Sequence, residues 1–228
     1  KHVKIKAKYT LFCLAEGSFL LHYRFTGIPH IKDFPYENRL QTIYSLPLTH
    51  LKDSAIRFQI KFANGMILHY YDTRCLSHLS IDTSRKGFND YPQTKKVAED
   101  LDHFTPLPYP TFKEQFSTYK HDIKTFLLDQ TLAPSGIGNY LANEICAASH
   151  LNPWLLVRQL SSADYLKLLT GINVVLGHCR QGTDYVWFRV FNRSTCAICD
   201  TPIIKKRHKK GAQSTFYCPS CQICKSAL

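Results

Sequence analysis

The sequence predicts an α+β fold in which an antiparallel β-sandwich precedes a helical region and a cysteine-rich β-hairpin. Three observations lead to this class. Apolar residues alternate between tight turns over residues 3–70, helical periodicity follows from residue 112, and two Cys-x-x-C pairs lie near the C-terminus. We expect three domains, namely the sandwich over 1–110, the helices over 111–190 and the cysteine hairpin over 191–228.

Two β-hairpins are indicated in the N-terminal region. The first joins the alternating residues 9–13 and 19–23 through a turn at 15–18. In the second, the apolar residues of 56–62 share one face by period two, and Asn64-Gly65 supplies the tight turn. Antiparallel strands in this number are typical of a sandwich or a barrel.

Helical periodicity begins after a polar segment. Residues 77–110, which are rich in proline towards their end, are predicted to form a linker or a long surface connection. Helices are predicted over 112–130 and 137–148. A third helix begins at Ser161, where Asp164 completes a capping box.

Composition favours a polyanionic partner. The 29 Lys and Arg residues outnumber the 17 Asp and Glu residues, which gives a formal charge of +12. Nucleic acid is the leading partner for such a charge, and a merely basic protein is the alternative. No apolar run approaches the roughly 18 residues of a membrane span, and the basic N-terminus alternates in polarity, unlike a signal peptide.

The nine cysteines fall into two groups. Five are scattered, which fits reduced thiols in a cytosolic or nuclear compartment better than a disulfide framework. We therefore expect a cytoplasmic protein if the source is prokaryotic and a nuclear protein if it is eukaryotic. The other four form the two pairs, with 18 residues between them: Cys196, Cys199, Cys218 and Cys221.

These paired cysteines predict one structural Zn²⁺ ion. Two residues between ligands let both thiolates of a turn reach the same ion, and two such turns complete a closed tetrahedral shell. A redox-active Cys-x-x-C is the alternative for each pair, and His208 and Cys224 are alternate ligands. Between the pairs, the basic run 205–210 is expected to contact phosphates, or else to form a solvated turn.

A glycine turn precedes the second predicted helix. Gly136 and Gly138 allow a close approach of another backbone, and Asn139 stands where the helix begins. The side chain of Asn139 and the first backbone N–H groups of the helix could hold a phosphate. The alternative is that the turn serves packing alone.

These motifs together resemble a known family. A helix, a glycine turn, the run Gly136-Ile137-Gly138-Asn139 and a Cys₄ hairpin ending in Thr-Phe-Tyr-Cys-x-x-Cys-Gln are similar to the formamidopyrimidine-DNA glycosylase / endonuclease VIII family. The resemblance covers almost the whole chain and implies a helix–two-turn–helix module and a zinc-finger hairpin. It implies a monomeric DNA glycosylase and AP lyase that flips damaged bases out of double-stranded DNA.

The resemblance assigns roles to residues of the β-sandwich. Lys8, which precedes Tyr9, matches a lysine that contacts the DNA backbone near the lesion and assists catalysis, although it could be only an exposed lysine. Phe25, Arg74 and Leu76 match side chains that fill the gap left by the flipped base. Leu76 departs from the family's aromatic residue and remains an apolar wedge.

The helical region and the hairpin carry the predicted phosphate contacts. Lys124 and Asn139 match the family's phosphate-binding pair, and Glu144 matches a structural acid. Gln213 stands where the family has an arginine near the tip of its zinc hairpin, and this hairpin is two residues longer than usual. Because glutamine lacks the charge of arginine, we expect Lys209 or Lys210 to substitute.

The largest departure from the family lies at the N-terminus. The family's nucleophile is an N-terminal proline followed by a glutamate, whereas this chain starts at Lys1 with residues that match an interior hairpin. We expect that an N-terminal segment is omitted, with a fragment or a degenerate homologue as the alternative. A chain that begins at Lys1 is not expected to form the proline Schiff base with an abasic site.

Substrate preference and the competing functions follow from the remaining segments. The loop near residues 181–187 is short where the family closes over 8-oxoguanine, which predicts an endonuclease VIII-like preference for oxidised pyrimidines or ring-opened purines. A catalytically silent module that recognises damaged DNA is the second candidate function. An RNA-binding zinc-ribbon protein is the third, although the helix–turn segment does not suit it.

Overall fold

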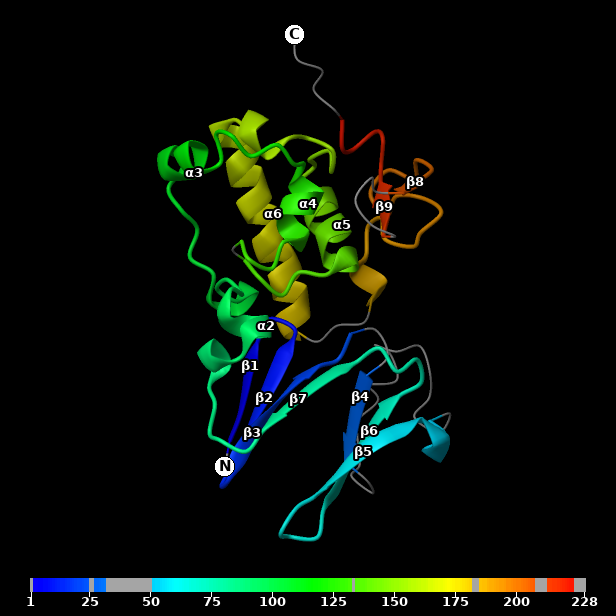
Figure 1. Ribbon diagram of the computed structural model, residues 1–228. Helices are drawn as coiled ribbons and strands as arrows, with labels where there is room; N and C mark the ends of the chain where they lie inside the picture. The colour runs from blue at the N-terminus through cyan, green and yellow to red at the C-terminus, as the bar shows by residue number, and fades with distance from the viewer. Residues whose placement is uncertain are drawn as a thin grey trace. The chain divides into compact units, whose positions relative to one another are not determined.

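The computed structural model describes residues 2–24, 27–31, 51–132, 134–181, 185–207 and 213–223. The chain divides into two compact units, Lys1–Lys96 and Val97–Leu228 (Figure 1). We call them the β unit and the helical unit. The boundary falls inside the segment that the sequence assigns to a connection, and the helices share their unit with the cysteine hairpin.

The first sheet of the β unit has four antiparallel strands. They are β1 (His2–Lys6), β2 (Tyr9–Leu14), β3 (Gly17–His22) and β7 (His78–Asp82), in the order β1-β2-β3-β7. The predicted first hairpin is confirmed, since β2 pairs with β3 through the turn at 15–16. Gly17 has φ +133°, and a Cβ there would lie 2.6 Å from the carbonyl oxygen of Asp82, so the position requires glycine.

The second sheet has three antiparallel strands in the order β4-β6-β5. They are β4 (Gly27–Ile31), β5 (Ile56–Lys61) and β6 (Ile67–Asp72). The predicted second hairpin is confirmed, because β5 pairs with β6 and its residues alternate between partly buried and exposed. Gly65 in the connecting turn has φ +84°, as the Asn64-Gly65 pair predicts.

The predicted β-sandwich is confirmed by a core that both sheets share. Leu21 of the first sheet clusters with Leu68 and Tyr70 of the second. The rings of Phe58 and Tyr70 stack with centroids 4.7 Å apart, and Phe19 meets Phe58 edge-on at 6.4 Å. Interleaved aromatic and aliphatic side chains from two facing sheets are the usual interior of this architecture.

The prediction that residues 77–110 form only a connection is wrong for part of that segment. Strand β7 pairs with β3 along its whole length, and α2 (Pro92–Lys95) follows. Every residue of β3 is buried, so its backbone needs a partner on each edge. The five residues of β7 alternate between polar and apolar side chains, as strand residues do, and its apolar residues Leu79 and Ile81 are exposed.

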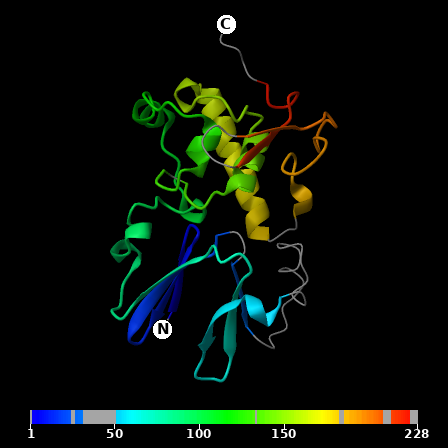
Figure 2. The same ribbon diagram turned by 45° about the vertical axis from the view of Figure 1, so that its right-hand side comes forward.

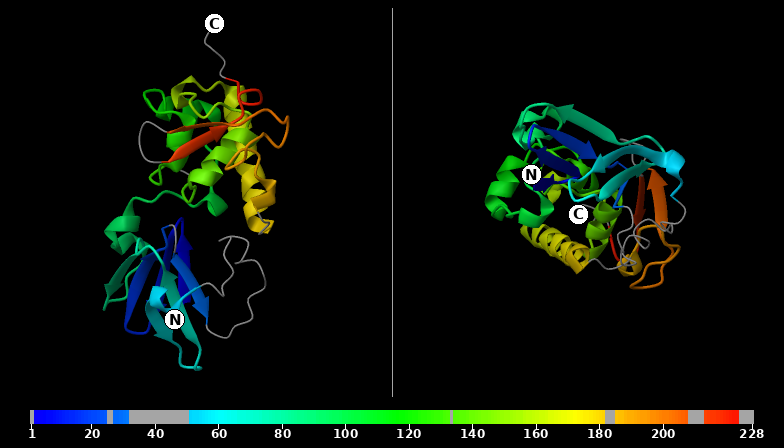
Figure 3. Two further views of the ribbon diagram at one scale, coloured as in Figure 1. Left: turned by 90° about the vertical axis from the view of Figure 1, so that its right-hand side faces the viewer. Right: turned by 90° about the horizontal axis from the view of Figure 1, so that it is seen from below.

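The helical unit contains four main helices. They are α3 (Tyr109–Gln115), α4 (Ile123–Leu128), α5 (Asn139–Ala148) and α6 (Ser162–Gln181). Their apolar faces enclose one core, which includes Ile123, Ile137, Ile145, Leu160 and Leu168, all nearly inaccessible to solvent. Figure 3 shows α6, drawn in yellow, running beside α5.

The single helix predicted over 112–130 is in fact two helices. Between α3 and α4 the chain turns at Phe116 and Tyr119. The carboxylate of Asp122 then accepts a hydrogen bond from Thr125 N at 2.8 Å. Asp122 therefore caps a new helix instead of continuing the first. The capping box of the third predicted helix is confirmed by reciprocal bonds between Ser161 and Asp164.

The C-terminal hairpin packs on the helices of its unit. Strands β8 (Ile204–Arg207) and β9 (Ser214–Tyr217) are antiparallel, and Phe216 clusters with Ala147 of α5 and Val190. Figure 2 shows the red strand β9 lying against the helices. None of the helices in the described part of the chain combines the length and the apolar character needed to cross a membrane.

We predict that Gly171 controls the packing of α6 on α5. A Cβ at Gly171 would lie 2.1 Å from Ser149 Oγ and 2.8 Å from the backbone oxygen of Ile145, so Gly171→Ala forces the helices apart. We expect a loss of about 1–3 kcal/mol in the free energy of unfolding, measured by urea denaturation. Gly177→Ala is the matched control, because a Cβ there meets nothing within 4 Å. The control should gain up to about 1 kcal/mol from helix propensity, and equal effects would contradict the prediction.

Candidate functional site

The four paired cysteines converge at one point beside the hairpin. Cys196, Cys199, Cys218 and Cys221 have sulfur atoms that all lie within 4.8 Å of one another. Individual Sγ–Sγ separations are 3.4 Å, 3.5 Å and 4.0 Å for the pairs 199–221, 199–218 and 196–221. A tetrahedral shell with metal–sulfur bonds of about 2.3 Å has edges of about 3.8 Å, whereas a disulfide requires about 2.05 Å. The geometry therefore suits one tetrahedral ion.

Local backbone geometry supports thiolates at this cluster. Ile198 N donates to Cys196 Sγ at 3.5 Å, and Cys221 N donates to Cys218 Sγ at 3.4 Å. Amide donors of this kind favour a charged sulfur. Cys196 and Cys218 are buried whereas Cys199 is exposed, so a bound ion would be covered on one side and open to solvent on the other. The alternate ligands His208 and Cys224 lie outside the described residues.

Two predicted phosphate-binding residues converge on the backbone of the hairpin. Lys124 Nζ, on α4, donates to the carbonyl oxygen of Ser214 at 2.9 Å and to Thr215 Oγ1 at 2.8 Å. Asn139 Nδ2, at the first turn of α5, donates to the same carbonyl oxygen at 3.2 Å. Gln213, the residue before Ser214, is exposed. The structure therefore brings Lys124, Asn139 and Gln213 to one place.

Lys124 differs from the other members of this group in its burial. Its side chain has no exposed surface, and burial lowers the pKa of its ammonium to about 8. In this structure the ammonium faces the hairpin, so a direct contact between Lys124 and a phosphate stays a prediction. Lys209 and Lys210 lie outside the described residues, and the contacts assigned to them also stay predictions.

The structure adds one residue, Asn143, that the sequence did not single out. Asn143, one helical turn after Asn139, donates to the backbone oxygen of Asn139 at 2.7 Å and accepts from Phe216 N at 2.8 Å. The spacing of four residues could have placed Asn143 on the same helix face. Its partners, the main-chain atoms of the hairpin, carry no signal in the sequence.

Glu144 anchors the segment that leads into the cysteine cluster. Its buried carboxylate accepts hydrogen bonds from three consecutive backbone N–H groups, those of Arg189, Val190 and Phe191, at 2.7, 3.0 and 2.7 Å. Desolvation raises the pKa of Glu144, and the three donors act in the opposite direction. This arrangement agrees with the structural role that the sequence suggests for Glu144.

In the β unit, Lys8 sits in the two-residue turn between β1 and β2. Ala7, its neighbour in the turn, has φ +52°. Burial, followed by the charge of Arg24, lowers the pKa of Lys8 to about 8. The same two causes, with Lys8 as a third, lower the pKa of His22 to about 4. This end of the sheet is therefore a crowded cationic site that would favour an anion.

Arg74 and Leu76 lie in the turn between β6 and β7. The carboxylate of Asp72, which is 1% exposed, accepts hydrogen bonds from Arg74 N at 3.2 Å and Ser77 N at 2.8 Å. These bonds hold the turn so that the side chains of Arg74 and Leu76 are exposed. Phe25, the third predicted gap-filling residue, lies outside the described residues.

Comparison with known proteins gives consistent relatives. The chain is 33% identical to the formamidopyrimidine-DNA glycosylase of Ureaplasma parvum serovar 3, over 97% of this chain and 82% of that protein. It is 26% identical to the protein of the same name from Mycoplasma genitalium, over 96% and 77%. No family model matches the chain.

Solved structures agree in fold. The chain superposes with a TM-score of 0.74 and 21% identity on a Lactococcus lactis formamidopyrimidine-DNA glycosylase crystallised with DNA that contains an AP site, covering 97% of this chain and 80% of that one. A structure of the L. lactis protein with DNA containing FAPY-dG gives the same TM-score at 20% identity, over 98% and 82%. At this level of identity the likeness concerns the fold.

We predict that the cysteine cluster holds one metal ion on which the hairpin depends. Cys218→Ser removes a buried ligand, so we expect the loss of bound metal, measured by atomic emission, and faster proteolysis within residues 190–223. Cys179→Ser, an exposed thiol on α6, is the matched control and should leave both readouts unchanged. Stoichiometric metal with an unaltered cleavage pattern in Cys218→Ser would overturn the assignment.

Proposed function

Because the chain belongs to the formamidopyrimidine-DNA glycosylase family, we propose that it is a DNA-repair glycosylase with an AP-lyase step. Its substrate is double-stranded DNA that contains an oxidised base or an abasic site. The observation that carries this proposal is the convergence of Lys124 and Asn139 on Ser214, directly beside the exposed Gln213. Helices α4 and α5 thereby hold the hairpin so that the half-buried Asn139 and the exposed Gln213 lie beside each other, where a phosphate can bind.

In this proposal the DNA backbone is held at the N-terminus of α5. Asn139 is half-buried and opens a helix of ten residues, so its amide and the first backbone N–H groups can donate to a phosphate oxygen. Gln213 adds a neutral donor from the hairpin. Lys124 positions that hairpin from beneath, and Lys209 and Lys210 supply the positive charge that Gln213 lacks.

The β unit acts at the lesion. Lys8 contacts the backbone at the damaged nucleotide and assists catalysis, while Arg74, Leu76 and Phe25 fill the gap left by the flipped base. Exposure of Arg74 and Leu76 on a turn fixed by Asp72 supports this role, since an apolar wedge must reach the base stack. Filling the gap offsets part of the cost of unstacking.

The chemical steps require an amine nucleophile. In a protein that carries the family's Pro-Glu ahead of Lys1, the proline nitrogen attacks C1′ of the sugar and the damaged base leaves. The base takes the proton that the proline nitrogen loses, and the C1′–O4′ bond then breaks, with O4′ taking up a proton, to give an iminium between the proline nitrogen and C1′. Loss of a proton from C2′ and cleavage of the C3′–O bond release the 3′-phosphate and nick the strand, and water then hydrolyses the iminium and frees the proline. Lys8, with its lowered pKa, is a cation near this reaction and not the proposed nucleophile.

We propose Zn²⁺ as the ion of the cysteine cluster. Four thiolates at tetrahedral spacing are the donor set that this ion prefers for structural sites. Cys196, Cys199, Cys218 and Cys221 fill all four positions, so the ion would shape the hairpin and leave no open coordination position for substrate.

We predict that the hairpin and the α5 turn grip phosphates. Asn139→Ala and Gln213→Ala should weaken the binding of an abasic-analogue duplex by about tenfold without changing the salt slope, because both groups are neutral. Lys209→Ala or Lys210→Ala should reduce the slope of log K against log salt by about 0.9. Lys167→Ala, whose side chain is half-exposed on α6, is the control. If none of these four variants changed the affinity or the salt slope, the proposed phosphate contacts would be refuted.

Substrate preference is predicted to be endonuclease VIII-like. The protein with its N-terminal nucleophile should excise oxidised pyrimidines and formamidopyrimidines, and nick the strand, faster than it excises 8-oxoguanine opposite cytosine. Single-turnover nicking of the three duplexes measures this order, and an undamaged duplex is the control. Efficient removal of 8-oxoguanine would contradict the preference, whereas binding without any nicking would favour a silent DNA-binding homologue.

A pH dependence is predicted from Lys8. Its pKa of about 8 means that the ammonium loses its proton as the pH rises through 8, and phosphate binding favours the protonated form. Affinity for an abasic-analogue duplex should therefore fall between about pH 7 and 9, where an ordinary lysine stays charged. Lys8→Gln should bind more weakly at pH 7 and reduce this pH dependence, leaving the part that Lys124 contributes, since its pKa is also about 8. Lys6→Gln is the control, and an unchanged profile in Lys8→Gln would refute the assignment.

A further inference from the structure

The β unit carries a second cationic site, which the proposed function does not use. A cleft of about 470 Å³ opens between the start of β1, the end of β2 and the segment that follows β7. Its lining includes four basic side chains and the end of β2: His2, Lys4, Arg85, Lys86, Cys13 and Leu14. No acidic side chain lines it among the described residues.

The cleft lies at the far end of the sheet from Lys8. His2 pairs with Cys13 and Lys4 pairs with Leu11, so both basic side chains share one sheet face. The turn that contains Lys8 closes the opposite end of the same two strands. Strand β1 separates His2 from this turn by about 14 Å, which is four residues at about 3.4 Å each. A ligand in this cleft would therefore not occupy the proposed lesion site.

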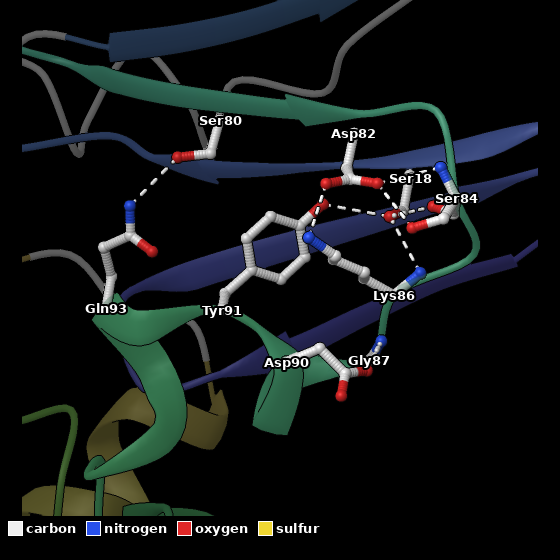
Figure 4. A network of polar contacts seen from close by, with 9 residues as sticks. All are labelled: Ser18, Ser80, Asp82, Ser84, Lys86, Gly87, Asp90, Tyr91 and Gln93. Atoms are coloured by element: carbon white, nitrogen blue, oxygen red, sulfur yellow. Dashed lines mark hydrogen bonds and ion pairs between the residues drawn. The ribbon is translucent and has the colours of Figure 1, made fainter.

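The wall of the cleft is fixed before any ligand arrives. Ser18, which is 2% exposed, donates from its hydroxyl to Ser84 O and accepts from Lys86 N, both at 3.1 Å. Within the segment, Asp90 accepts from Gly87 N at 2.7 Å. Figure 4 shows the bonds of Ser18 tying the segment to the sheet. A rigid wall lowers the entropy that binding would cost.

The basic groups of the wall are also oriented. Arg85 Nε donates to the carbonyl oxygen of Ala15 at 2.7 Å, which fixes a guanidinium whose Nη atoms carry further donors. Lys86 is partly neutralised, because its Nζ lies 2.5 Å from Asp82 Oδ2. Arg85, Lys4 and His2 are therefore the groups that can meet a ligand, and the first two carry the dominant charge.

We propose that this cleft binds a phosphate group. A guanidinium and an ammonium that line the same cleft match the several oxygens and the multiple charge of phosphate better than a single carboxylate. The group could belong to a free phosphorylated compound or to a phosphodiester of DNA outside the lesion site. Both sources present the same phosphate oxygens to the cleft, and an experiment can distinguish them.

The test uses the whole chain and two probes, inorganic phosphate and a short undamaged DNA duplex, at constant ionic strength. We expect phosphate to shift the amide resonances of Cys13 and Gly87 in a saturable manner. Lys4→Gln combined with Arg85→Gln should weaken phosphate binding by about tenfold or more, because charge-assisted hydrogen bonds are lost. Lys52→Gln combined with Lys61→Gln removes two exposed charges from the same unit outside the cleft, and should leave the affinity unchanged.

Shifts of the same resonances by the duplex, competed by phosphate, would support a phosphodiester as the natural ligand. Shifts by phosphate alone would support a free phosphorylated compound. Absence of shifts with both probes would overturn the proposal, and so would an equal loss of affinity in the control variant, since that result indicates general attraction to a basic protein.

Discussion

The ammonium of Lys124 is buried between helix α4 and the hairpin, where it donates to Ser214 O and Thr215 Oγ1. Taking a cation out of water is costly, so its partners must remain in place to offset that cost. The same burial lowers the pKa of Lys124, because it disfavours the charged form. Because both partners lie on β9, a shift of the hairpin that kept Lys124 buried would leave its ammonium without hydrogen-bond acceptors.

Other contacts reinforce this attachment from α5. Asn139, Asn143 and Ala147 follow one another at intervals of four residues and therefore face the same side. Both asparagines bond to the hairpin, and the small side chain of Ala147 allows Phe216 to pack closely. Glu144 holds the segment before the cluster through three backbone N–H groups. The cysteine cluster thus lies beside a hairpin whose position is set by helix side chains.

The β unit holds its proposed DNA contacts by a different means. Ala7, Arg24 and Cys75 are three non-glycine residues in the left-handed region, with φ between 52° and 53°. Each stands beside a residue assigned to DNA: Lys8, Phe25, and the pair Arg74 and Leu76. Such conformations cost about 1–2 kcal/mol per residue and persist when the surroundings fix them, as Asp72 does for Cys75. Rigid turns would present Lys8, Arg74 and Leu76 in a set orientation.

Local sequence signals were enough to predict many of the strands, helices and turns of this protein. Period-two alternation and Asn64-Gly65 predicted the hairpins, Ser161 and Asp164 predicted the start of α6, and the cysteine spacing predicted the cluster, because each depends on neighbours within a few residues. The strand β7 and the break before Asp122 were not predicted in this way. The first depends on the need of β3 for a second edge partner, and the second on a cap that competes with helix continuation.

For the candidate site too, some features follow from the sequence and others only from the tertiary structure. The sequence by itself determined which residue types are present, namely four thiolates, a lysine, an asparagine and a glutamine in place of an arginine. Only the tertiary structure decided that Lys124 turns its ammonium inward to a carbonyl group 90 residues away. That partner is a main-chain atom, which every residue possesses, and its position depends on packing between distant segments.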